Sequence, residues 1–133
     1  MLKETVFNAL VEEFGDAVES TSDSIAFAEI KAKHPAVGNV SVQDDGTEIT
    51  LFIGDITHGH FGSYEDDLSE EEHERVIAES LVEFLSDLFE DKYFLYTSRH
   101  SGGWARFDMV QESDMQSPNT QWFKWSGPIE KLE

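Results

Sequence analysis

The chain has 133 residues, no cysteine, and 28 acidic against 9 basic residues, so its formal net charge is −19. The absence of cysteine excludes a disulfide framework, a thiolate nucleophile and a thiolate metal site. With 39% hydrophobic and 12% aromatic residues, a chain of this length can bury a core, and we expect a single domain over residues 1–133.

The negative charge lies in the first two thirds of the chain. Residues 92–133 carry five basic and five acidic residues, whereas residues 65–91 carry twelve acidic residues and one basic residue, Arg75. Such a surface repels phosphate groups, which disfavours binding to nucleic acid or anionic membranes. We see neither a secretory signal peptide nor an apolar run long enough to span a bilayer, so we expect a cytoplasmic protein.

The first half of the chain predicts one helix followed by strands. Apolar side chains recur every three or four positions over residues 2–20, which predicts an amphipathic helix. Residues 25–33 predict a strand, with a helix as the alternative because the segment contains alanines. Two β-like runs, residues 37–43 and 47–53, flank Asp44-Asp45-Gly46, whose residue types tolerate left-handed backbone angles. This pattern predicts a β-hairpin.

The second half begins with a helix signal and continues with short strands. Ser69 and Glu72 have the spacing of a capping box, and the apolar periodicity after them predicts a helix that ends near Asp91. The pattern then predicts a strand, a glycine-bearing loop, a strand, a polar loop and a short strand, over residues 93–98, 99–103, 104–110, 111–119 and 121–125.

The predicted order is helix, three strands, helix, three strands. An antiparallel sheet of about five to six strands, with both helices on one face, would bury the apolar stripes of the two helices. We therefore predict an α+β fold, a two-layer sandwich.

Asp55, His58 and His60 are the candidate metal ligands, because imidazole and carboxylate groups suit zinc or another divalent first-row ion. Gly59, between the two histidines, would let the backbone bend so that both side chains converge. In an extended segment the two histidines would share a face anyway, because strand side chains alternate. The spacing matches no established metal motif, and an incidental histidine pair at a strand end is the alternative.

Four acidic residues of the second helix form a predicted ridge, which we call the acidic ridge: Glu79, Glu83, Asp87 and Glu90. Like charges at spacings of three or four destabilise a helix by about 0.2–0.5 kcal/mol per pair. Charges of a single sign therefore favour a cationic partner surface. The alternative is a solvated face that serves only solubility.

All three tryptophans, Trp104, Trp122 and Trp125, lie in the C-terminal third, and we call them the aromatic edge. Trp122 and Trp125 have opposite parity, so a regular strand cannot bury both on one face. An exposed tryptophan would be an anchor for a partner. The alternative is that all of them fill the edge of the core.

These features favour a small acidic interaction module that binds and inhibits a basic protein partner, as immunity proteins and inhibitors of nucleases or toxins do. This function needs neither a cofactor nor catalysis. The alternative is a small metal-dependent enzyme or ligand-binding domain that uses Asp55, His58 and His60 with a divalent metal such as zinc. No feature of the sequence determines the oligomeric state.

Overall fold

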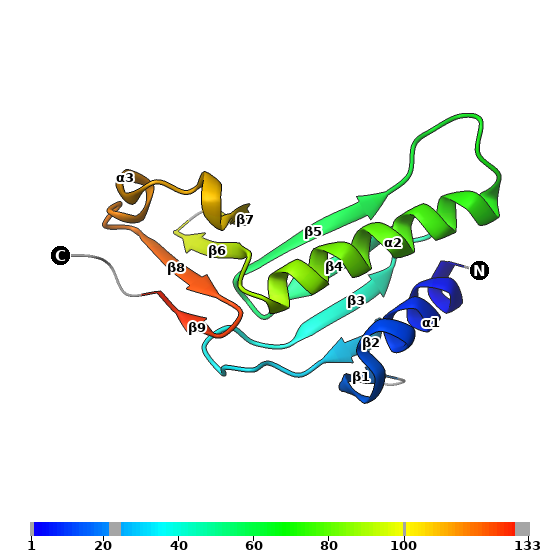
Figure 1. The fold of residues 1–133 in the computed structure, drawn as a ribbon, viewed down its shortest axis with the longest axis horizontal. Coiled ribbons are helices and arrows are strands. Elements are labelled where there is room, and N and C mark those ends of the chain that lie inside the picture. The colour runs from blue at the N-terminus through cyan, green and yellow to red at the C-terminus, as the bar shows by residue number, and fades with distance from the viewer. Residues whose placement is uncertain (1, 22–24, 100, 130–133) are drawn as a thin grey trace.

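The computed structural model describes residues 2–21, 25–99 and 101–129 (Figure 1). Its helices are α1 (Leu2–Phe14), α2 (Glu70–Phe89) and α3 (Glu112–Met115), with 3₁₀ turns η1 (Gly15–Ala17) and η2 (Phe107–Met109). Its strands are β1 (Val18–Ser20), β2 (Ala26–Ile30), β3 (Val40–Asp44), β4 (Glu48–Ile53), β5 (Thr57–Gly62), β6 (Tyr93–Ser98), β7 (Gly102–Arg106), β8 (Thr120–Lys124) and β9 (Gly127–Pro128).

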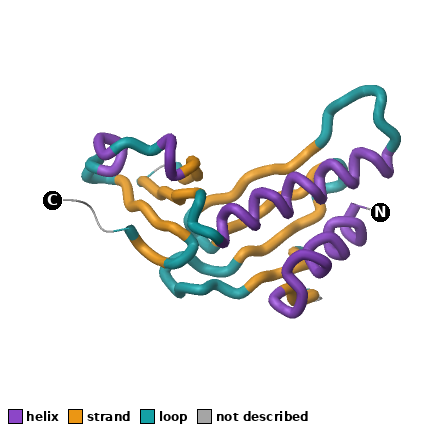
Figure 2. The backbone as a smooth tube through the Cα atoms, viewed as in Figure 1, coloured by secondary structure: helices purple, strands orange, loops and turns teal. Residues whose placement is uncertain are grey.

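The strands form two antiparallel sheets. The larger sheet has the order β1-β2-β3-β4-β5, and α1 and α2 lie side by side on one of its faces (Figures 1 and 2). The smaller sheet has the order β7-β6-β8-β9 and lies at the end of the larger one. The predicted α+β fold with two layers is confirmed, although the strands divide between two sheets of five and four instead of forming one.

After β5 the chain reverses through α2, which runs back over the larger sheet to the end where β5 begins (Figure 1). The smaller sheet lies at this end, and β5 contacts both β6 and β7. Strand β6 pairs there with β7 and β8, its neighbours along the chain.

The first helix is shorter than its apolar pattern predicts. Gly15 has φ +59°, a left-handed conformation that commonly follows the last turn of a helix. The chain then turns, and β1 pairs with β2 at the edge of the larger sheet, with Val18 opposite Ile30. The predicted helix over residues 2–20 is thus wrong beyond Phe14, and the apolar residue Val18 belongs to a strand.

The hairpin of β3 and β4 is confirmed. The Asp45 N–H donates to the Glu48 carbonyl at 2.9 Å, and the Gly46 N–H donates to the Asp44 carboxylate at 2.8 Å. Gly46 itself has φ +98°, a backbone conformation that is unfavourable for residues with a side chain. Residues 26–30 form a strand, so the helical alternative for that segment is wrong.

The long helix α2 begins where its capping residue predicts. The Ser69 hydroxyl accepts from the Glu72 N–H at 3.1 Å and donates to the Glu72 carboxylate at 3.2 Å. The helix ends at Phe89, and Asp91 then adopts φ +62°.

The elements after α2 agree with the prediction in part, and β9 is an additional short strand that the pattern does not predict. Strands β6 and β8 form where the pattern predicts strands, but β7 ends at Arg106 and is followed by η2. The predicted loop over residues 111–119 contains the short helix α3. The Gln111 side chain caps its first turn, while the Gln111 N–H donates to Asp114.

One apolar core joins α1 and α2 to both sheets. It includes Leu51 of β4, Phe84 of α2, and Leu95 and Phe123 of the smaller sheet. In the ranges that the structure describes, no helix is both long enough and apolar enough to cross a bilayer.

Candidate functional site

The face of the larger sheet opposite α1 and α2 presents polar and aromatic side chains from β4 and β5. Alternation places Ile49, Leu51 and Ile53 of β4 in the core, where all three are fully buried. Glu48, Thr50 and Phe52 therefore point to the opposite face, which we call the open face.

His58 and His60 of β5 lie on the open face beside these residues. The register pairs Phe52 with His58 and Thr50 with His60. The two imidazole rings are edge-to-face, with centroids 5.8 Å apart, and the His58 ring also lies 5.5 Å from the Phe52 ring. Both histidines are exposed. The segment is extended, so the shared face comes from strand alternation.

Gly59 has a packing role instead of the predicted bend. It points to the core side of β5, where a Cβ atom would lie 2.2 Å from Cη2 of Trp104. The absence of a side chain lets the Trp104 ring pack directly on the strand. The Trp104 ring also lies 4.5 Å from the Phe84 ring and 6.4 Å from the Phe61 ring. The glycine between the histidines is thus explained by packing of the smaller sheet on β5.

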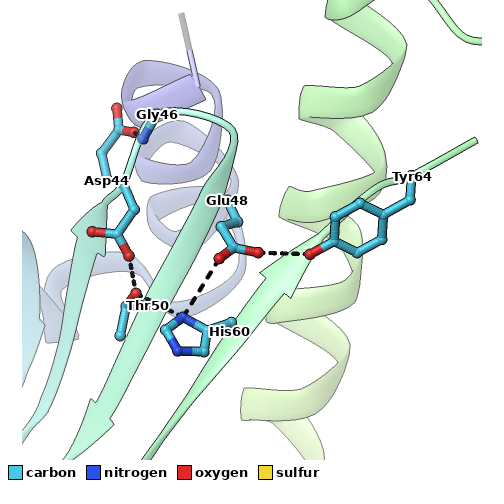
Figure 3. A network of polar contacts seen from close by, with 7 residues as sticks. Asp44, Gly46, Glu48, Thr50, His60 and Tyr64 are labelled. Carbon is cyan, nitrogen blue, oxygen red and sulfur yellow. Dashed lines mark hydrogen bonds and ion pairs between the residues drawn. The ribbon is translucent and has the colours of Figure 1, made fainter.

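A polar network surrounds His60 (Figure 3). The Thr50 hydroxyl donates to the Asp45 carboxylate, and its oxygen lies 3.0 Å from Nδ1 of His60. Because a hydroxyl has one proton, and Asp45 accepts it, Nδ1 of His60 is the donor to Thr50. The Glu48 carboxylate, 3.9 Å from the same nitrogen, favours the same protonation. His60 is thereby held with its proton on Nδ1, which leaves Nε2 as the available lone pair.

Tyr64 extends this network across the hairpin. Its hydroxyl donates to Oε2 of Glu48 at 2.6 Å (Figure 3). This hydrogen bond to a carboxylate, followed by the negative charge of Glu48, raises the pKa of Tyr64 above its ordinary value of 10.0. The Tyr64 side chain is otherwise exposed.

Asp55 does not join the two histidines. It lies in the exposed turn between β4 and β5 and lines a hollow of about 250 Å³ with His58, whereas His60 lies outside that hollow. Among the residues that the structure describes, no three His, Cys, Asp or Glu side chains converge as a metal-ligand set. Zinc binding by Asp55, His58 and His60 together stays a prediction.

The acidic ridge divides into two halves. Glu79 and Glu83 are exposed and form no ion pair within the described part of the chain, whereas Asp87 is partly buried and contacts Arg106 at 3.3 Å. Lys92 lies 3.8 Å from Asp87 and 2.9 Å from Glu90.

These contacts stabilise the charged forms of the two bases. The pKa of Lys92 is raised, first by its hydrogen bond to Glu90 and then by the charge of that carboxylate. The pKa of Arg106 is also raised, first by an interaction with Tyr93, whose ring centroid lies 5.4 Å from the guanidinium carbon, and further by Asp87. The C-terminal half of the ridge is thus neutralised by bases of the same chain.

The tryptophans of the aromatic edge pack inward. Trp122 and Trp125 are 8% and 5% exposed, and Trp104 is half-buried against Phe84. Both Trp122 and Trp125 are buried because Trp125 lies past the end of β8, where strand parity no longer applies. The burial favours the core alternative over an exposed anchor. The Trp122 indole N–H has no hydrogen-bond partner among the described residues.

No family model, curated protein or solved structure matches this chain. A functional assignment therefore depends on the chemistry of the open face and of the acidic surface. The sequence pattern identifies the two histidines of the open face but misses their neighbours Asp45, Glu48 and Thr50. The signal for Thr50 was its position, a polar residue inside the most apolar strand, two residues from Phe52.

Proposed function

We propose that this protein is a small acidic interaction module that binds, and thereby inhibits, a basic protein partner. The observation that carries the proposal is a set of exposed carboxylates on α2 and the loop before it that form no ion pair within the described residues. This set, which we call the acidic surface, comprises Glu65, Asp66, Asp67, Glu70, Glu71, Glu79 and Glu83, and all seven residues are exposed.

Within the described residues, no member of the acidic surface forms an ion pair with a base of the chain. At the C-terminal end of α2, by contrast, Arg106 and Lys92 contact Asp87, and Lys92 also contacts Glu90 just after the helix. The one base among residues 65–91, Arg75, is not enough to balance the set. The charge of the acidic surface is therefore available to an external cation.

Such a field favours a basic protein by steering its approach. Unpaired charges of one sign raise the association rate of an oppositely charged partner and repel polyanions. The binding surface in this proposal is centred on Glu79 and Glu83 and extends toward Ser69. It excludes Asp87 and Glu90, because their charges are already compensated.

The test is a charge-matched comparison of association rates. Carbodiimide cross-linking in an extract of the source cell, followed by mass spectrometry, would identify a partner through carboxylate–lysine links. With that partner purified, association is measured for the wild type, for Glu79→Lys/Glu83→Lys, and for Glu12→Lys/Glu13→Lys. The second double variant makes the same change in net charge at exposed positions of α1.

We expect reversal at Glu79 and Glu83 to slow association by about ten-fold or more at low salt, and the α1 control to slow it by about three-fold or less. The difference should shrink as salt is added, because screening acts over about 8–10 Å. Saturating protein should also reduce the activity of the partner. Equal rates for the two variants would show that only net charge matters, and absence of any linked basic partner would refute the proposal.

A further inference from the structure

We propose that His58 and His60 form a two-imidazole chelate for a divalent transition-metal ion on the open face of the larger sheet. The inference does not depend on the proposed partner binding, because the histidines lie on the side of the sheet opposite α2. It also differs from the predicted three-residue site, since Asp55 takes no part.

The separation of the two rings fits a shared ion. Imidazole nitrogens bind zinc at about 2.0–2.1 Å in a tetrahedral arrangement, which places the centroids of two ligating rings about 5–6 Å apart. The observed centroid separation is 5.8 Å. Both rings are exposed on one face of a paired strand, so the ion could bind without a change in the backbone.

Each histidine also has a cross-strand neighbour that orients it. Phe52 packs against the His58 ring, and Thr50 bonds to Nδ1 of His60. Thr50 is itself held by the Asp45 carboxylate. A carboxylate–hydroxyl–imidazole chain of this kind fixes the tautomer and the ring orientation of a metal-binding histidine. It directs Nε2 of His60 to the ion, and Thr50 is a positioning residue.

The chemistry of the pair selects the class of metal. Imidazole favours zinc, nickel and copper over the hard ions magnesium and calcium, which prefer oxygen ligands. The Glu48 carboxylate beside His60 adds negative potential that favours a cation. Water fills the remaining coordination positions, so binding is weaker than in a closed four-ligand site.

The probe is nickel ion, titrated calorimetrically into protein without a histidine tag. Magnesium in large excess occupies carboxylates that would otherwise bind nickel adventitiously. The variants are His58→Ala, His60→Ala and Thr50→Val, and the matched controls are His34→Ala and His73→Ala. The two control histidines lie away from the proposed site. His34 accepts a hydrogen bond from the Ala36 N–H, and His73 is hydrogen-bonded to the Ser63 hydroxyl. Circular dichroism verifies that each variant is folded.

We expect one ion per chain, with affinity reduced at least about ten-fold by either His58→Ala or His60→Ala. Thr50→Val should reduce affinity by about 10-fold, the lower end of the range for residues that orient ligands. Both controls should bind as the wild type does. Absence of nickel binding, or binding that survives His58→Ala and His60→Ala, would overturn the chelate. Wild-type affinity in a folded Thr50→Val variant would overturn the positioning role of Thr50.

Discussion

Gly59 shows how one position without a side chain can serve both faces of a strand. On the core side it admits the Trp104 ring, and its neighbours His58 and His60 point to the open face. The tripeptide that resembles a metal motif is therefore also the point where the smaller sheet packs on the larger one. The packing position Gly59 and the two histidines are neighbours in sequence but lie on opposite faces, because strand side chains alternate.

Replacing Gly59 with alanine should lower the free energy of unfolding by about 1–3 kcal/mol, because the new methyl group overlaps Trp104. A double-mutant cycle with Trp104→Leu isolates the contact. The cost of Gly59→Ala should fall when the ring is absent. Urea denaturation of the wild type, the two single variants and the double variant measures the four free energies of unfolding. An equal cost in both backgrounds would mean that the alanine acts through the backbone and not through Trp104.

At the scale of elements, α2 has two electrostatically different ends. Its exposed residues Glu79 and Glu83 form no ion pair within the described part of the chain, whereas its C-terminal end is joined to β7 through the contact of Asp87 with Arg106. Reversing the charge of a ridge residue should therefore have opposite effects on stability at the two ends.

We expect Glu83→Lys to leave the free energy of unfolding unchanged or to raise it by about 0.5 kcal/mol, because it relieves like-charge repulsion along the helix. Asp87→Lys should lower it by about 1–2 kcal/mol, since two ion pairs are lost and a cation is placed beside Arg106 and Lys92. Thermal and urea unfolding of both variants measure the difference. Equal stability of the two would show that the contacts of Asp87 contribute nothing measurable.

At the scale of the whole molecule, one core connects the two sheets. Leu51 lies in the larger sheet, whereas all three tryptophans belong to the segment that forms the smaller sheet. Because the core is continuous, the two sheets should unfold together. The expectation of one domain over residues 1–133 depends on this cooperativity and stays a prediction.

Leu51→Ala and Phe84→Ala should each lower the free energy of unfolding by about 2–5 kcal/mol, because both side chains are buried. Val76→Ala, at a position 38% exposed on α2, is the control and should cost about 1 kcal/mol or less. Unfolding is followed by circular dichroism and by tryptophan fluorescence. If Leu51→Ala shifted the unfolding transition measured by circular dichroism but not the one measured by tryptophan fluorescence, the smaller sheet would be an independent unit.

The sequence by itself determined the features that depend on neighbours along the chain. The Ser69 cap, the turn at Asp44 and Gly46, and the shared face of His58 and His60 are all set by interactions within four residues. Apolar periodicity also predicted the α+β class correctly, because each helix must cover a sheet to bury its stripe. The end of α1 was missed although Gly15 marks it, since the apolar pattern continues into β1.

Only the tertiary structure decided which distant groups meet. Arg106 reaches Asp87, Trp104 packs on Gly59, and the strands divide into two sheets, none of which follows from local pattern. Thr50 reaches His60 through strand register, which puts residues ten positions apart within hydrogen-bond distance, and Asp45 is linked to His60 through Thr50. These outcomes depend on where the chain reverses and which strands pair, and periodicity along the sequence carries no information about them. The same physical reason explains why the acidic ridge is one feature in the sequence and two in the folded molecule.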